Sequence, residues 1–298
     1  MVRRALAVLA WMVALAWGGH AWFRHASLQE FDEAHAHAWV LVGDSHADDV
    51  KWGGRPRFSG PAQDLFSSLK MVESLKSTAT DSSKVQGVVL TFWPNKFSPL
   101  AERRLSGVAQ EDNWGSMAFG RIAPLMTLRD LVRPEVPLRY RMRMAFHTLQ
   151  FKTTFAWWDE QCEQDHVGES YSHGLSDGMR LHNWWDEARV SPGLFQAIVD
   201  EVTSQGWHLV LLENPLHPTY YDQVNAEALA AYETWMASFE AHPSGRVHWV
   251  PLGRENDDFT LFRDYHHLTC KGEAFVKEAL DGELERISLG GAGTFVRE

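Results

Sequence analysis

Short apolar runs alternate with amphipathic segments along most of this chain. Such runs are typical of strands covered on both faces, and we expect strands at 40–42, 85–93, 207–212 and 246–251. Apolar residues recur at helical spacing between and after these runs, which predicts helices at 61–76, 192–206, 225–241 and 272–284. Alternating strands and helices predict an α/β fold with a mainly parallel sheet that helices cover on both faces.

The first 23 residues follow a different pattern. Arg3 and Arg4 precede an apolar stretch from Ala5 to Phe23, about the length that crosses a bilayer as a helix. Because the arginines flank its N-terminal side, we expect a single-pass inner (cytoplasmic) membrane protein whose remaining chain lies outside the cytoplasm. A cleaved signal peptide, with a small-residue site at 19–21, is the alternative.

Composition and spacing divide the rest of the chain. Residues 24–37 are polar and are interpreted as a linker, with a helical linker as one alternative, and residues 38–298 form the predicted domain. Within that domain, the stretch at about 98–190 has no regular period, and we interpret it as an insertion or lid over the site. An extracytoplasmic compartment would permit a disulfide between Cys162 and Cys270, but their spacing does not decide whether they pair.

Charge and histidine spacing exclude some classes of function. The formal net charge is −11, which disfavours nucleic acid as a partner. The chain has 15 histidines, but none lies in a tight metal-ligand spacing on a recognisable helix. We therefore expect no metal and no cofactor.

Two short motifs far apart in the sequence carry candidate chemistry. Residues 43–45, Gly-Asp-Ser, follow the first predicted strand, and residues 264–267, Asp-Tyr-His-His, follow the last one. Functional groups gather at the carboxyl ends of strands in open α/β sheets. A serine nucleophile needs an imidazole to take its proton and a carboxylate to orient that imidazole. We therefore predict Ser45 as nucleophile, His267 as base and Asp264 as its orienting carboxylate, with His266 as the alternative base.

Together with Gly60 and Asn95, these motifs resemble the four blocks of the SGNH, or GDSL-like, hydrolase superfamily. The resemblance implies a three-layer, flavodoxin-like sandwich. It also implies that Gly60 and Asn95, with the backbone N–H of Ser45, form the oxyanion hole. Each has a structural alternative, since Asn95 fits a turn at a strand end and Gly60 fits a helix entry.

His46 follows Ser45 where leucine is usual in the superfamily, and Gly-Asp-Ser-His looks like its membrane-anchored branches. These include the alginate O-acetyltransferases and the D-alanine transfer protein of teichoic acids. The resemblance implies an O-acyltransferase or esterase that acts on an envelope polysaccharide through an acyl-serine intermediate. It also implies two kinds of partner: the acylated polysaccharide or acyl donor, and an integral membrane protein that passes the acyl group on.

A second class of function stays open on the sequence alone. The middle of the chain is rich in tryptophan, at positions 157, 158, 184 and 185. Exposed aromatic rings suit glycan binding, so the alternative is a catalytically inactive SGNH-like module that binds glycan or acts as a scaffold in an export complex. Residues 213–218 end a predicted strand and either line the substrate pocket or form a turn fixed by proline.

Overall fold

The computed structural model describes residues 2–58, 65–98, 101–102, 125–133, 138, 165–166, 190–253 and 257–290. Gly60 and most of the predicted insertion lie outside these residues, and Ser45 is described by its backbone alone. The predicted motifs around Asn95, Asp264 and His267 lie inside the described part.

A single five-stranded parallel sheet forms the centre of the domain, with the strand order β2-β1-β3-β4-β5. The strands are β1 (Trp39–Val42), β2 (Arg57–Phe58), β3 (Gly87–Phe92), β4 (His208–Glu213) and β5 (Val247–Pro251). The expected α/β class and parallel sheet are confirmed. The edge strand β2 was not predicted, because two residues, one of them an arginine, give no apolar run.

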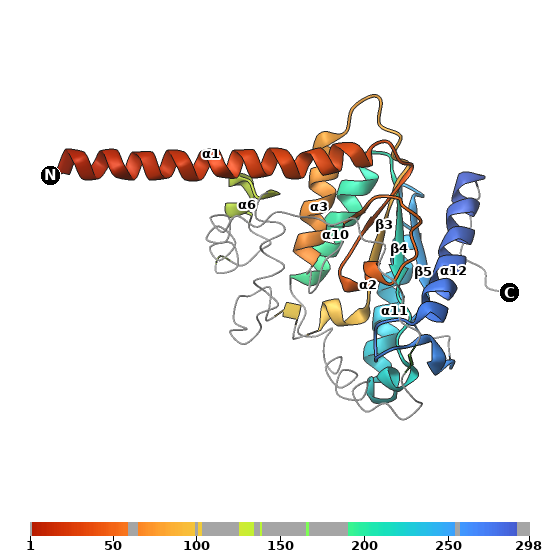
Figure 1. Ribbon diagram of the computed structural model, residues 1–298. Coiled ribbons are helices and arrows are strands. Elements are labelled where there is room, and N and C mark those ends of the chain that lie inside the picture. The colour runs from red at the N-terminus through yellow and green to blue at the C-terminus, as the bar shows by residue number, and fades with distance from the viewer. Residues whose placement is uncertain are drawn as a thin grey trace.

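Helices follow the strands in the alternating order that the sequence predicts. They are α1 (Val2–Ala34), α2 (Ser45–Asp48), α3 (Leu65–Thr78), α6 (Leu128–Leu131), α10 (Ser191–Thr203), α11 (Ala226–Glu240) and α12 (Cys270–Ser288). In the described part of the chain, three 3₁₀ turns lie between them: η1 (Pro94–Phe97), η3 (Pro218–Gln223) and η4 (Phe259–Leu261). Figure 1 shows α3 and α10 on one side of the sheet and α12 on the other.

Both faces of the sheet are buried because successive side chains of each strand point to opposite sides. In β1, Val40 and Val42 pack in the core beneath α3, α10 and α11, whereas Trp39 and Leu41 pack in the core beneath α12. The other inner strands alternate in the same way. Continuous apolar runs therefore predicted these strands correctly, since no face of them needs a polar residue.

Helix α1 continues without a break from Val2 to Ala34, through most of the segment expected to be a linker. Its C-terminal end packs against α3, where Phe31 and Ala34 are fully buried and Phe31 stacks on Phe58 with ring centroids 4.1 Å apart. The rest of α1 extends away from the sheet (Figure 1). In the described part of the chain, no helix combines the length and apolarity needed to cross a bilayer, so the predicted anchor finds no support.

The two ends of the predicted insertion meet on the domain. The Glu102 carboxylate accepts backbone N–H groups of Val190 (3.1 Å) and Ser191 (2.7 Å), which satisfies donors at the start of α10. Within the insertion, Asp130 pairs with the buried Lys70 of α3 at 2.9 Å. Residues near the two ends of the insertion, Glu102 and Val190, are thus joined to each other. After the insertion, Cys270 at the start of α12 is disulfide-bonded.

Candidate active site

The predicted catalytic segments gather at the carboxyl edge of the sheet. Ser45 follows β1, Asn95 follows β3, and Asp264 and His267 lie in the loop between β5 and α12. Strands β1 and β3 are neighbours in the sheet. From β1 the chain continues to the edge strand β2 on one side, and it then crosses to β3, β4 and β5 on the other side. Such a reversal in strand order is where open α/β sheets bind their ligands.

The turn after β1 needs a glycine for steric reasons. A Cβ atom on Gly43 would lie 1.8 Å from Thr91 Oγ1 of β3, so no larger residue fits without a shift. Asp44 then caps the one-turn helix α2, because its carboxylate accepts the N–H of His46 at 3.0 Å. The backbone of Ser45 is thereby fixed as the first residue of α2, beside β3.

A buried ion pair joins this turn to the one that carries Asn95. Lys96 contacts the Asp44 carboxylate, and the two side chains are only 14% and 5% exposed. Burial opposes ionisation of Asp44, but the Lys96 ammonium and the hydrogen bond from His46 hold its pKa well below the usual range. Asp44 is therefore a charged structural group that ties the β1 turn to η1.

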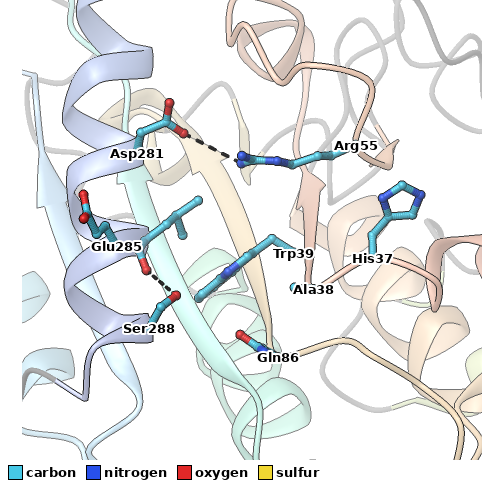
Figure 2. Close-up of a pocket in the computed structure, with 9 residues that line it drawn as sticks. His37, Ala38, Trp39, Arg55, Gln86, Asp281, Glu285 and Ser288 are labelled. Atoms are coloured by element: carbon cyan, nitrogen blue, oxygen red, sulfur yellow. Dashed lines mark hydrogen bonds and ion pairs between the residues drawn. The ribbon is translucent and has the colours of Figure 1, made fainter.

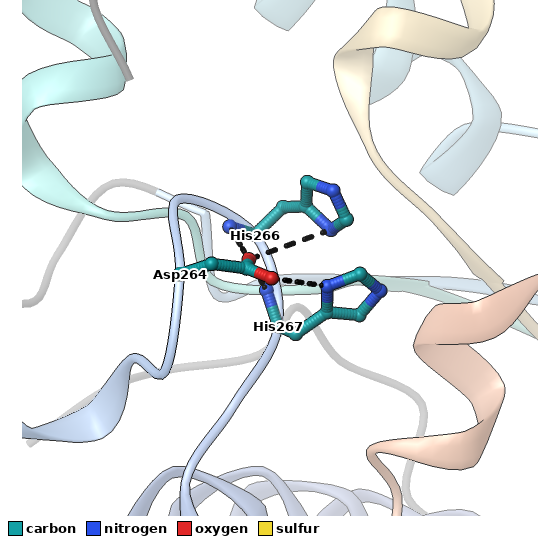
Figure 3. Close-up of side chains that lie close together, drawn as sticks. All are labelled: Asp264, His266 and His267. Atoms are coloured by element: carbon teal, nitrogen blue, oxygen red, sulfur yellow. Dashed lines mark hydrogen bonds and ion pairs between the residues drawn. The ribbon is translucent and has the colours of Figure 1, made fainter. Parts of the chain in front are cut away.

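Asp264 and His267 form a hydrogen-bonded pair, as predicted. His267 Nδ1 lies 2.7 Å from Asp264 Oδ2, and Asp264 Oδ1 accepts the backbone N–H groups of His266 (2.9 Å) and His267 (2.7 Å), as Figure 3 shows. Burial alone would raise the pKa of Asp264, but its hydrogen bond to His267 and the nearby imidazoles keep that pKa low. Asp264 is thus an ionised carboxylate that orients the His267 ring. His266, the alternative base, has its Nδ1 3.9 Å from Asp264 Oδ1.

Backbone pairing closes the loop that presents this dyad. Phe262 and Leu268 form an isolated antiparallel bridge, and Arg263 N donates to His267 O at 3.0 Å. His217 N, after β4, donates to Tyr265 O at 3.0 Å. The loop is therefore held both at its base and from the neighbouring strand, which keeps Asp264 and His267 in register.

His46 connects the two distant motifs. Its ring stacks on the ring of His267 with centroids 5.5 Å apart and an interplanar angle of 18°, and the His266 ring centroid lies at 4.9 Å. Because His46 directly follows Ser45, the dyad lies beside the turn that carries the predicted nucleophile. Trp93 covers this group, with centroids 5.2 Å from His46 and 5.1 Å from His266.

Asn214, just after β4, holds the backbone of the same turn. Its Nδ2 donates to the His46 carbonyl oxygen at 3.0 Å, and the side chain is fully buried. The segment 213–218 was considered as a pocket wall or a turn, but the specific contact of Asn214 was not predicted. A buried asparagine at a strand end is the only sequence feature that could have indicated it.

Electrostatics around His46 favour its neutral form. Burial, together with the nearby His267 and Lys96, lowers the pKa of His46 to about 4, against the opposing effect of Asp44 and Asp264. Asp49 Oδ2 lies 4.0 Å from His46 Nδ1, and burial raises the pKa of Asp49 well above its usual value. Neither His46 ring nitrogen has a hydrogen-bond partner among the described residues.

Of the two residues predicted for the oxyanion hole, Asn95 lies among the described residues and Gly60 does not. Asn95 lies in η1 and is half-buried, and its Oδ1 has no hydrogen-bond partner within the described part of the chain. Because η1 follows the carboxyl end of β3, Asn95 lies at the same edge of the sheet as the loop that carries the dyad. Gly60 lies outside the described residues.

A separate hollow of about 470 Å³ lies at the opposite end of the sheet. Trp39, Gln86 and Asp281 are among its lining residues, and Arg55 pairs with Asp281 across it at 3.7 Å (Figure 2). Because Trp39 and Gln86 lie at the amino ends of β1 and β3, this hollow is separate from the candidate site at the carboxyl edge.

No protein-family model matches this chain, and the comparison with curated proteins finds no similar sequence. Evidence for a function therefore comes from the site itself.

We predict that Lys96→Met destabilises the fold strongly, because it leaves the Asp44 carboxylate buried and unpaired. The expected loss in the free energy of unfolding is about 3–5 kcal/mol, measured by urea denaturation. The double variant Asp44→Asn/Lys96→Met should lose less than Lys96→Met alone. Lys271→Met is the matched control, because the Lys271–Asp258 pair is exposed and its loss should cost under about 1 kcal/mol. Equal effects in the two lysine variants would contradict the buried role of Lys96.

We also predict a pH-dependent stability that originates at His46. The unfolded imidazole, with its ordinary pKa of 6.5, takes up a proton as the pH falls, whereas the folded one resists protonation down to about 4. Stability should therefore fall across this window, by about 2–3 kcal/mol between about pH 7 and pH 4.5. Urea denaturation of His46→Leu should show a shallower slope than wild type.

The control for this measurement is His25→Leu, an exposed position on α1, which should keep the wild-type slope. Burial also lowers the pKa of His248 to about 4, but His248 is present in all three proteins and cancels in the comparison. Parallel slopes for wild type and His46→Leu would show that His46 is not the source.

Proposed function

We propose that this chain is a serine-dependent enzyme of acyl-ester chemistry, in which Ser45 is the nucleophile, His267 the base and Asp264 its orienting carboxylate. One observation carries the proposal. The Asp264–His267 hydrogen bond of 2.7 Å lies beside His46, the residue that follows Ser45. The strand order and the Gly-Asp-Ser turn also support a place among SGNH-type hydrolases.

The proposed reaction begins with attack of Ser45 Oγ on the acyl carbonyl carbon. Asp264 holds Nδ1 of His267, so Nε2 takes the serine proton and then passes it to the leaving ester oxygen. The C–O bond of the ester breaks and an acyl-serine remains. Water or a sugar hydroxyl then attacks the acyl carbon, and the proton follows the same route back.

Negative charge on the carbonyl oxygen needs preorganised donors during both attacks. Asn95 is the proposed side-chain donor, because it follows β3 next to the turn of Ser45 and its turn is tied to that one by the Asp44–Lys96 pair. The backbone N–H groups of Ser45 and Gly60 complete the proposed set.

The proposed substrate is an acylated envelope polysaccharide, with hydrolysis and transfer as the two outcomes of one acyl-serine. We further propose that the enzyme acts outside the cytoplasm, beside an integral membrane protein that supplies the acyl group. The support for substrate, place and partner is the sequence resemblance alone.

A fluorophosphonate probe tests the nucleophile directly, because it modifies only an activated serine. We expect stoichiometric labelling of wild type, none of Ser45→Ala, and unchanged labelling of the exposed control Ser204→Ala. Asp264→Asn should slow labelling by about 10⁴-fold and Asn95→Ala by about 10²–10³-fold. A folded wild type that does not label would refute the enzymatic proposal and favour the inactive glycan-binding or scaffold protein.

Acyl transfer and hydrolysis differ only in the acceptor, so one assay separates them. Acetyl release from a chromogenic ester is measured with and without oligosaccharide acceptors, and the sugar is analysed by mass spectrometry. Faster release together with acetylated sugar is expected for a transferase, because the acceptor hydroxyl competes with water for the acyl-serine. Free acetate at an unchanged rate would contradict transfer and leave an esterase.

A further inference from the structure

The loop that holds the catalytic dyad also gathers three side chains that can bind a metal ion. One carboxylate oxygen of Asp264 and one ring nitrogen each of His266 and His267 all lie within 4.8 Å of one another. Figure 3 shows the three side chains close together on this loop. Imidazole and carboxylate are ligands that Zn²⁺ and other divalent transition metals take readily.

These side chains are held in place before any metal arrives. Asp264 Oδ1 accepts two backbone N–H groups of its own loop, and the Phe262–Leu268 bridge closes that loop. The imidazole of His266 packs against two aromatic rings, those of Trp93 at 5.1 Å and His46 at 4.9 Å. Preorganised ligands lower the entropic cost of metal binding, because the loop does not have to become ordered when the ion binds.

His266 is the member of this group that the proposed acyl chemistry does not use. Its Nδ1 is buried, lies 3.9 Å from Asp264 Oδ1, and has no hydrogen-bond partner among the described residues. A buried polar atom without a partner is costly and calls for a ligand. A metal ion between Nδ1 and the Asp264 carboxylate would supply that partner.

We propose that Asp264, His266 and His267 bind one divalent transition-metal ion, tested as Zn²⁺, and that this metal switches the dyad off. Three protein ligands leave further positions of the ion to water. The metal site itself follows from the cluster, whereas the inhibition rests on the proposed function of Ser45 and His267.

The position of one proton on His267 explains why the metal-bound form cannot act as a base. In the proposed dyad, the N–H at Nδ1 of His267 donates a hydrogen bond to Asp264, and Nε2 is the nitrogen that accepts the serine proton. When the metal takes Nδ1 and a carboxylate oxygen, that proton moves to Nε2. Nε2 then cannot accept the proton of a serine hydroxyl, so nucleophile activation stops without any change in the number of protons.

Titration of the full-length protein with Zn²⁺ by calorimetry, and with Co²⁺ by visible absorption, tests the site. We expect one ion per chain, with binding at least about tenfold weaker in His266→Gln. His25→Gln, an exposed histidine on α1, is the matched control and should bind as wild type does. Should His266→Gln fail to fold, His266→Phe keeps a ring against Trp93 and His46 and removes the ligand. Binding that is absent, or equal in wild type and the His266 variant, overturns the proposal.

The inhibitory half has its own measurement. Zn²⁺ should slow fluorophosphonate labelling of wild type at least about tenfold, a chelator should restore it, and His266→Gln should label at a rate that Zn²⁺ does not change. Labelling that Zn²⁺ slows equally in both proteins overturns the switch. If wild type binds the metal through His266 but the fluorophosphonate never labels it, the proposed acyl chemistry is refuted and the metal site is supported.

Discussion

The buried ion pair between Asp44 and Lys96 is the contact on which the geometry of the candidate site depends. Asp44 ends the turn after β1 and caps α2, while Lys96 belongs to the turn after β3. The buried Asp44 carboxylate needs the Lys96 ammonium to remain charged, so this pair links the two turns. Ser45 and Asn95 lie in these two turns. The Asp44–Lys96 ion pair therefore fixes the position of one turn relative to the other.

The second constraint is aromatic packing across the carboxyl edge. His46, His266 and His267 lie in mutual contact, and Trp93 covers them. Burial keeps His46 neutral, so its ring packs against the dyad without placing a charge beside it. The same packing that orients His267 toward the β1 turn places His266 where a metal ion would compete with the dyad. One loop of the chain thus supports both the proposed chemistry and its proposed inhibition.

Much of the fold was predictable because buried parallel strands and amphipathic helices leave strong local patterns. Four of the five strands that the structure describes, and the four helices expected after residue 60, follow the predicted positions within a few residues. The edge strand β2 is too short to give a pattern, and nothing local distinguishes the expected linker from the continuous helix α1. Within the site, the spacing of Asp264 and His267 indicated their pairing, since three residues in a turn bring the two side chains together.

Local sequence therefore determined the α/β class, the order of elements and the candidate dyad, because each depends on residues close together in the chain. Only the tertiary structure decided what surrounds that dyad. The contacts of His46 with His267, of Asn214 with the His46 carbonyl and of Lys96 with Asp44 join segments from different strands. Such contacts arise because the parallel sheet brings the carboxyl ends of its strands to one edge. Spacing along the chain does not predict which side chains then meet there.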